Sequence, residues 1–478
     1  MSSPGRRFSL SGSLDMVSGF SARSNRRSSI SSTSSADLLY STKAFESAVS
    51  ASQGKAFSVD DFELGRTIGK GRYARVRLAR LKGVGSSIPL CLKILKKQDI
   101  CMMNQVDHIV NEKDVLASAR HPFIIQMVQT FQDKTRLYMA LELVNGGELF
   151  NLLRSEKRFK DNMARFYISE VVVALEYLHG MLIAYRDIKP ENILIHRTGH
   201  IKLTDFGFAK YLKGEKTYTT CGTPAYMAPE IIRGKGHGLA VDWWAAGILL
   251  FEMFSGRPPF VAQEDHEVCR LIAQGHVLYP PVMSKVNKDI ITRLLIADPA
   301  RRLGNPEAPG MSIREHQFFK DVDWEAVNAG ALQPPWRPQV RNADEDTSLF
   351  DHFEESSGTA KSSGPVVEDT GLFDKWAERV DMREEALALA QELREAHEKK
   401  RADLQKMKDA EEARMKELQR LDDEQKRSVG DGTVSKARRT SERLKDQTDT
   451  VPEDTVSAMD SCSKKSSKGL CAGACAVQ

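Results

Sequence analysis

The chain has 478 residues, a formal net charge of +4 at pH 7 and 41% hydrophobic residues, so it is long enough for about two or three domains with a sizeable core. This mild charge gives no general reason to expect nucleic-acid binding, and no apolar run approaches the roughly 18 residues that a membrane span needs. The 7 cysteines, an odd number without metal-ligand spacing, favour a reducing compartment, so we expect a cytoplasmic protein.

Residues 1–57 are rich in Ser and Arg and poor in periodic apolar residues. Such a composition does not bury enough apolar surface to offset the entropy of ordering, so we expect disorder, with a short helix at 36–50. Ser9 and Ser29 each follow two arginines and a spacer and precede an apolar residue. That pattern is typical of sites for basophilic kinases, although solvated basic disorder explains it as well.

From Phe62 the pattern changes to two strands joined by a tight turn, because apolar and polar residues alternate around a pair of glycines. Gly69 and Gly71 would let backbone amides approach the phosphates of a nucleotide without a Cβ in the way, and Val76 follows on the second strand. The third glycine of such loops is replaced by Ala74. Taken alone, the motif is better explained as a plain hairpin.

The next predicted strand, at 90–94, carries a single lysine, Lys93. Glu112 follows about twenty residues later, in a helical segment at 105–118, and a lysine on such a strand can hold phosphate oxygens if a carboxylate fixes its position. By itself Lys93 would be a solvated strand lysine. Together with the glycine pair and Glu112 it becomes a candidate phosphate ligand.

A further strand at 137–144 is broken by Asn145-Gly146-Gly147 before a helix that begins near Glu148. We expect this link to be a hinge between two lobes, where Glu142 and Val144 offer backbone groups to an adenine ring and Leu141 is the gatekeeper. A strongly amphipathic helix at 161–180 follows. It leads directly into the stretch with the densest polar chemistry.

That stretch runs from Tyr185 to Gly207 and reads Y-R-D-I-K-P-E-N, a short hairpin, and then D-F-G. Two short runs of β-branched residues around a turn place one polar cluster before the hairpin and another directly after it. The stretch can thereby bring together four polar side chains, those of Asp187, Lys189, Asn192 and Asp205. Asn192 and Asp205 can bind Mg²⁺ through hard oxygens while Asp187 accepts a hydroxyl proton, which indicates phosphoryl transfer.

In this order and spacing the motifs resemble those of a eukaryotic protein serine/threonine kinase of the AGC group, closest to the cAMP-dependent catalytic subunits. The resemblance covers about 62–376 and includes T-C-G-T-P-A-Y-M-A-P-E and V-D-W-W-A-A-G besides the motifs above. It implies an α+β, bilobal protein-kinase fold. The kinase domain would span 62–319, with a β-rich N-lobe at 62–144 and a helical C-lobe at 145–319, and an AGC C-terminal tail would follow at 320–376.

A cGMP-dependent or other AGC kinase is the alternative within the same group. A pseudokinase scaffold is a more distant one, and it is disfavoured because Lys93, Asp187, Asn192 and Asp205 are all present. The chain shows no recognisable cyclic-nucleotide-binding domain, so we expect regulation by phosphorylation, by location, or by a partner such as a regulatory subunit or inhibitor.

The resemblance implies ATP and Mg²⁺ as cofactors and assigns a role to each polar group. Lys93 would grip the α and β phosphates and pair with Glu112, and Asn192 and Asp205 would hold Mg²⁺. Asp187 would orient the substrate hydroxyl while Lys189 neutralises charge on the transferred phosphoryl group. The resemblance also assigns three supporting contacts: Thr223 would bridge Asp187 and Lys189, Glu230 would pair with Arg302, and Asp242 would anchor the backbone of the catalytic loop.

The segment 216–222 resembles an activation loop, with Thr219 at the phosphorylated position and Thr220 as a rival site. A phosphate would bring roughly two negative charges. Matching cations are available in Arg186, Lys213 and His108. We therefore expect an activating kinase, and we expect phosphorylated Thr219 to link the loop, the catalytic loop and the helix that carries Glu112.

Glu148, Glu191 and Glu252 resemble carboxylates that line the substrate cleft and bind arginines before the target serine. Ordinary helix or loop carboxylates are the alternative. The resemblance implies protein substrates with basic motifs, of the form Arg-Arg-x-Ser/Thr-apolar, and Ala225, where relatives carry Glu, puts recognition further upstream in doubt. Self-phosphorylation at Ser9, Ser29 and Ser441, which fit or nearly fit this form, follows as a hypothesis.

The tail at 320–376 would place Phe350 near the adenine, and Phe373 and Trp376 resemble a hydrophobic motif that docks on the small lobe. Residues 377–427 are rich in Glu, Lys, Arg, Ala and Leu without Gly or Pro, which predicts a long helix. Charged residues interrupt its heptad pattern, so a solitary helix and a weak coiled coil both remain open.

The segment 428–478 is polar, and we expect it to be disordered. It closes on Cys475-Ala476-Val477-Gln478, a pattern that fits a prenylation box, and Cys471 is a candidate for palmitoylation. One lipid binds membranes only marginally, so stable attachment to a membrane surface would need the second lipid or the nearby lysines. A free cysteine near a frayed end is the alternative.

Overall fold

The computed structural model describes residues 57–71, 73–82, 89–306, 308, 312–340, 346–353, 371–378 and 381–428. It divides into two compact units, one up to Ala390 and one from Gln391 onward. Several predictions lie outside the described residues: the helix at 36–50, the phosphorylation sites Ser9, Ser29 and Ser441, and the lipidation sites Cys471 and Cys475. No helix in the described part of the chain combines the length and the apolar character needed to cross a membrane.

The small lobe is built on a five-stranded antiparallel sheet in the order β1-β2-β3-β5-β4. Because side chains alternate along a strand, Leu90 and Leu92 of β3 pack in a cluster on one face, while Lys93 lies on the opposite face with Cys91 and Leu95. The elements of this lobe are η1 (Val59–Asp61), β1 (Phe62–Lys70), β2 (Ala74–Leu81), β3 (Pro89–Lys96), α2 (Lys97–Met102), α3 (Val106–Ser118), β4 (Met127–Gln132) and β5 (Arg136–Glu142).

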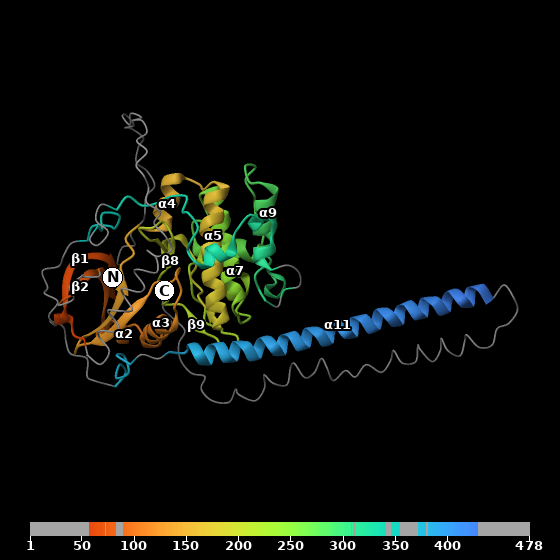
Figure 1. The fold of residues 1–478 in the computed structure, drawn as a ribbon, viewed down its shortest axis with the longest axis horizontal. Helices are drawn as coiled ribbons and strands as arrows, with labels where there is room; N and C mark the ends of the chain where they lie inside the picture. The colour runs from red at the N-terminus through yellow and green to blue at the C-terminus, as the bar shows by residue number, and fades with distance from the viewer. Residues whose placement is uncertain are drawn as a thin grey trace, which may run out of the picture. The chain divides into compact units, whose positions relative to one another are not determined.

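The large lobe is helical, and α7 lies at its centre because every residue from Ala240 to Phe254 is buried. Figure 1 shows α5, α7 and α9 side by side in this lobe. Its main helices are α4 (Leu149–Glu156), α5 (Asp161–Gly180), α6 (Pro229–Ile232), α7 (Ala240–Ser255), α8 (Asp265–Gln274), α9 (Lys285–Leu294) and α10 (Trp324–Asn328), and its short 3-10 turns are η2 (Pro190–Asn192), η3 (Pro224–Tyr226), η4 (Pro299–Arg301), η5 (Ile313–Glu315) and η6 (Gln317–Phe319). The predicted bilobal kinase fold is therefore confirmed.

Two small antiparallel pairs hold the catalytic stretch on the large lobe. The predicted hairpin is β7 (Ile193–Ile195) with β8 (Ile201–Leu203), and β6 (Ile183–Ala184) pairs with β9 (Lys210–Tyr211). At the open end of the hairpin the amide of Thr204 donates to the carbonyl of Asn192 at 3.0 Å. The ladder thus places Asn192 next to Asp205.

A buried ion pair supports the large lobe where the sequence predicts it. Arg302 is fully buried, and its two terminal nitrogens donate to the carboxylate oxygens of Glu230 at 2.7 and 2.9 Å. Three backbone carbonyls, of Ala240, Ile296 and Ala297, accept its remaining donors at 2.8, 2.9 and 3.4 Å. Because its donors are satisfied, this charge can be buried.

The long C-terminal helix α11 (Arg383–Ser428) begins later than its composition suggests. The helix was expected from 377, but the turns at 371–378 bury Phe373 and Trp376 against the small lobe and extend past that position. The Trp376 indole nitrogen donates to the carbonyls of Phe131 and Tyr138, and Thr130 donates to the Trp376 carbonyl. Packing therefore overrides helix propensity here. Beyond Ala390, exposed ion pairs such as Glu412–Lys416 fit a charged helix, and the coiled coil stays a prediction.

Candidate active site

An ion pair joins the central strand of the small lobe to α3. The Lys93 ammonium lies 2.6 Å from a carboxylate oxygen of Glu112, and both side chains are largely buried. Burial alone would lower the pKa of Lys93, but the carboxylates of Glu112 and Asp205 outweigh it and raise that pKa above its ordinary value. Lys93 therefore stays charged, and it lies close to the second polar cluster of the catalytic stretch.

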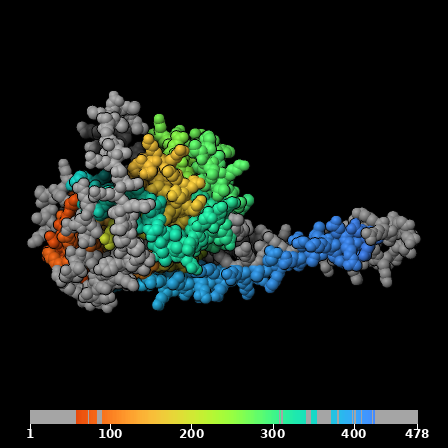
Figure 2. Space-filling view, turned by 45° about the horizontal axis from the view of Figure 1, so that its top comes forward, coloured from red at the N-terminus to blue at the C-terminus, as the bar shows by residue number. Residues whose placement is uncertain are grey.

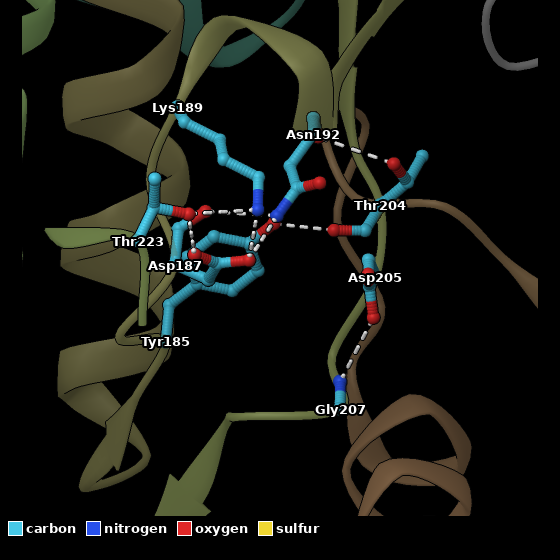
Figure 3. Close-up of polar contacts among 8 residues, drawn as sticks. All are labelled: Tyr185, Asp187, Lys189, Asn192, Thr204, Asp205, Gly207 and Thr223. Atoms are coloured by element: carbon cyan, nitrogen blue, oxygen red, sulfur yellow. Dashed lines mark hydrogen bonds and ion pairs between the residues drawn. The ribbon is translucent and has the colours of Figure 1, made fainter. Parts of the chain in front are cut away.

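Asp187 is the centre of that stretch (Figure 3). Its Oδ2 accepts from the Lys189 ammonium at 2.8 Å and from the Asn192 amide at 2.6 Å. Its Oδ1 accepts from the Thr223 hydroxyl at 3.2 Å, and that hydroxyl accepts from Lys189 at 3.0 Å. The structure thus brings Asp187, Lys189, Asn192 and Thr223 into one network, in which a carboxylate only 3% exposed is held from several sides.

Asn192 and Asp205 present oxygens on the neighbouring side of this network. Figure 3 shows the Asn192 amide nitrogen turned to Asp187 and its oxygen turned away, toward the segment that carries Asp205. The Asp205 carboxylate is exposed, and the nearest donor that contacts it in its own loop is the Gly207 amide at 3.3 Å. An amide oxygen and a carboxylate are hard ligands, so this pair fits Mg²⁺.

Strained backbone marks both ends of the site. Arg186 has φ 66° and Asp205 has φ 54°, values that residues with a Cβ rarely adopt. Asp242 compensates the backbone strain at Arg186, because its buried carboxylate accepts from the amides of Tyr185 and Arg186 at 2.9 and 2.7 Å. His179 holds the same carboxylate at 2.8 Å. The predicted anchoring by Asp242 is confirmed, and the part played by His179 is a contact that sequence reasoning missed.

The glycine pair lies at the end of β1, where the Gly71 amide donates to the Ala74 carbonyl at 2.8 Å. Neither glycine has positive φ. A Cβ at Gly69 would meet Val76 at 3.5 Å, and one at Gly71 would meet the Ala74 carbonyl at 3.7 Å, both ordinary contacts. The hairpin itself therefore does not require glycine at these positions, which favours the approach of a ligand as their reason.

At the hinge, the Glu142 carboxylate is bound to the buried Lys202 ammonium at 2.8 Å, so only the backbone of Glu142 and Val144 could face an adenine. The tail segment 346–353 follows nearby, and Phe350 is partly buried against the core. Arg66 of β1 donates to the Thr347 side chain and to the Phe350 carbonyl. Figure 2 shows this teal segment at the surface next to the orange small lobe. Sequence reasoning missed the Arg66 contact.

Thr219 is exposed, and the loop around it is fixed by the backbone pair of Thr217 with His237. Arg186 and His108 both contact Phe208. The Arg186 guanidinium donates to the Phe208 carbonyl at 2.7 Å, and the His108 ring lies against the Phe208 ring. Burial, and then the charge of Arg186, lower the pKa of His237 to about 4. The neutral ring can therefore accept from Arg186 at 3.4 Å.

The part that Lys213 would play in binding a phosphate on Thr219 stays a prediction. Lys213 follows β9 at φ 49°, and its ammonium turns back over the Tyr211 ring, 5.7 Å from the centroid. Lys210, inside β9, donates to the Thr217 hydroxyl at 3.0 Å. Within β9, alternation directs Lys210 and Tyr211 to opposite sides.

Among the three predicted cleft carboxylates, Glu191 lies within electrostatic range of both Glu148 and Glu252. Burial raises the pKa of Glu148, and the charges of Glu191 and Asp351 add to it. Burial also raises the pKa of Glu252, with a further contribution from Glu191, although Tyr226 and Arg154 oppose it. The cluster therefore concentrates negative charge that nearby cations only partly compensate.

The family model for the protein kinase domain matches residues 62–319, which is more than half of the chain. The human cAMP-dependent protein kinase catalytic subunit PRKX is 45% identical over 300 residues, which cover 63% of this chain and 83% of that protein. The mouse protein of the same name is 45% identical over 322 residues, 67% of this chain and 88% of that protein. In Saccharomyces cerevisiae, cAMP-dependent protein kinase type 3 is 42% identical over 299 residues, 63% of this chain and 74% of that protein.

The range matched by the family model contains the Lys93–Glu112 pair and the Asp187 network. ATP and divalent-metal use follow from the family. The chain belongs to the protein kinase family, as a protein serine/threonine kinase of the AGC type similar to the cAMP-dependent catalytic subunits.

Proposed function

We propose that the chain transfers the γ-phosphoryl group of ATP, with Mg²⁺, to serine or threonine in Arg-Arg-x-Ser/Thr-apolar sites. The observation that carries this proposal is the Asp187 network, in which donors from the catalytic loop and from Thr223 hold one buried carboxylate. Phosphoryl transfer asks the protein mainly for positioning and for charge stabilisation. A held carboxylate beside a held lysine supplies both.

Asp187 Oδ1 is the atom that we assign to the substrate proton. Oδ2 already accepts two short bonds, whereas the bond from Thr223 to Oδ1 is longer, at 3.2 Å. The substrate oxygen bonds to the γ-phosphorus as the bond to the β–γ bridging oxygen breaks and ADP leaves, and the hydroxyl proton passes to Oδ1. Lys189 stabilises charge on the phosphoryl oxygens.

Lys93 is the group that we assign to the α and β phosphates, and Gly69 and Gly71 are the positions where the backbone comes closest to them. Asn192 and Asp205 would hold Mg²⁺, which supplies positive charge to the phosphate oxygens when bound. Val76, Val144 and Phe350 would border the adenine. Each of these assignments rests on where the residue lies in the structure and on the chemistry of its side chain or backbone.

Replacement of the bridging hydroxyl tests the catalytic network. Thr223→Val should lower kcat for phosphate transfer from ATP to an arginine-containing peptide by about tenfold to a hundredfold, since hydrogen bonds to charged groups contribute about 1.5–3 kcal/mol. Thr223→Ser keeps the hydroxyl and should retain most activity. Wild-type kcat in Thr223→Val, or in Asp187→Asn, would contradict the network as the site of chemistry.

The arginine preference rests on the Glu148, Glu191 and Glu252 cluster. Burial desolvates the carboxylates of Glu148 and Glu252, that of Glu252 almost completely, and raises their pKa values, so an arriving guanidinium gains charge-assisted hydrogen bonds there. Arg154 lies only 3.5 Å from Glu252 and Tyr226 donates to the same carboxylate. These two groups keep Glu252 oriented while leaving part of its charge uncompensated.

The pH dependence of substrate binding tests this cluster. Because the pKa values of Glu148 and Glu252 are raised, their charge is lost as pH falls, earlier than for an ordinary glutamate. KM for an Arg-Arg peptide should therefore rise as pH falls, while a peptide with Gln in place of Arg should show a flat KM. Glu252→Gln should raise KM and make it less dependent on pH. Glu156→Gln, at an exposed position of α4, is the control. Equal KM for both peptides would refute the preference.

Activation by phosphorylation is the third part of the proposal. A phosphate on Thr219 would add roughly two negative charges. Arg186 of the catalytic loop, Lys213 and His108 of α3 are the cations expected to bind it. Lys210 of β9 is a further candidate, because it donates to the nearby Thr217 hydroxyl. After treatment with an activating kinase, Thr219→Ala should stay at the basal rate while Thr220→Ala is activated like the wild type. The opposite result would move the site to Thr220, and full activation of both variants would end the proposal.

The partners follow from the same chemistry. Protein substrates with basic motifs fit the cleft carboxylates, and the names of the relatives favour control by a separate regulatory subunit. Attachment to a membrane surface through Cys475 and Cys471, and self-phosphorylation at Ser9, Ser29 and Ser441, stay predictions of the sequence.

A further inference from the structure

The last residue of α3, Ser118, is bound by a segment that lies outside the region matched by the kinase-domain model. Ser118 is fully buried, and its carbonyl accepts from the Arg383 guanidinium at 3.2 and 3.3 Å. Its hydroxyl accepts from the Met382 amide at 2.9 Å. The last carbonyls of a helix have no partner within the helix, and positive charge is favourable there. Arg383 therefore caps the C-terminus of the helix that carries Glu112.

The cap is held in place by the first turns of α11. Ala386 and Ala390 follow Arg383 by three and seven residues, so all three share one face of the helix. Ala386 is 0% and Ala390 2% exposed, whereas the adjacent Leu387 is 44% exposed. Two small side chains let this face approach the protein closely. The start of α11 thus packs through one face against the kinase core, beside α3 and β9 (Figure 1).

The same turns also reach the large lobe. Burial chiefly raises the pKa of Tyr211 in β9, and the charge of Glu385 adds to it, so this carboxylate lies near the strand that begins the activation segment. Tyr177 of α5 lies within range of the charges of Arg383 and Asp381. The segment 381–390 therefore contacts the end of α3 and lies within electrostatic range of two elements of the other lobe.

We propose that residues 381–390 are a positioning element for α3, in which Arg383 caps the helix and Ala386 and Ala390 hold that cap. Glu112 lies in α3 six residues before Ser118, so a shift of the helix end changes the Glu112 position. The element acts through Glu112 on Lys93. This inference rests on the assignment of Lys93 to the phosphates of ATP.

The consequence is specific to ATP. When the cap is lost, Lys93 is held less well, so KM for ATP should rise and kcat should fall, while KM for the peptide should not change. We expect about a tenfold rise in KM for ATP, because the loss of hydrogen bonds to a charged group and of a favourable helix-end charge corresponds to about a factor of ten. A segment with only a structural role would change the amount of active enzyme and leave both KM values unaltered.

The test uses the full chain with matched substitutions at neighbouring positions. Arg383→Ala removes the cap, and Ala386→Glu places a charge on the buried face. Both should raise KM for ATP by about tenfold. Arg383→Lys keeps a positive charge at the helix end and should recover part of the loss. Leu387→Glu, on the exposed face of the same turn, should match the wild type in both KM values.

The variants separate the possible failures. If Ala386→Glu does not fold, Arg383→Ala, whose side chain is only partly buried, still decides the question. Wild-type KM for ATP in Arg383→Ala would overturn the positioning role, as would an equal effect of Leu387→Glu. Lys93→Ala in the same assay tests the assignment of Lys93 to the phosphates. Unchanged kcat and KM for ATP in Lys93→Ala would refute that assignment. If Lys93→Ala impairs the ATP kinetics and Arg383→Ala does not, only the role of residues 381–390 is refuted.

Discussion

The ion pair between Lys93 and Glu112 is the contact on which the other parts of the site depend, because it joins the central strand of the small lobe to a helix that reaches the large lobe. Helix α3 contacts other segments of the chain at several positions along its length. Asn111 donates to the Ala209 carbonyl just after the D-F-G motif, Lys113 donates to the carbonyls of Lys375 and Glu378, and Ser118 is capped by Arg383. The position of Glu112 therefore depends on contacts that α3 makes with the activation segment, the tail and α11.

The catalytic loop is positioned by a different kind of constraint. Arg186 and Asp205 hold strained backbone conformations, which cost of order 1–3 kcal/mol each and persist only where surrounding contacts enforce them. The Asp242 carboxylate supplies such contacts through two backbone amides, and the β7–β8 ladder fixes the distance between Asn192 and Asp205. The polar groups of the site are thus held in place before a substrate arrives, which is what phosphoryl transfer requires of a protein.

Local patterns made much of this predictable. The helix at 161–180, the short hairpin and the grouping of Asp187, Asn192 and Asp205 follow from periodicity and from motifs within a few residues. Contacts between distant segments were not accessible in that way: Arg383 lies 265 residues from Ser118, and nothing near either residue signals the other. The start of the long helix was misplaced, at 377 and not at Arg383, because the helix-forming composition begins before the turns that bury Trp376 have ended. Lys210 was missed because β9 has only two residues, too few for alternation to be seen.

The central claim is that Lys93 and Glu112 act as one unit in binding ATP. A double-mutant cycle on the affinity for ATP in the presence of Mg²⁺, with Lys93→Ala, Glu112→Ala and the double variant, tests it most directly. Residues that act through one contact are not additive, so the double variant should bind ATP no more weakly than the poorer single variant. Losses that add across the two substitutions would show that the two side chains act independently and would contradict the account.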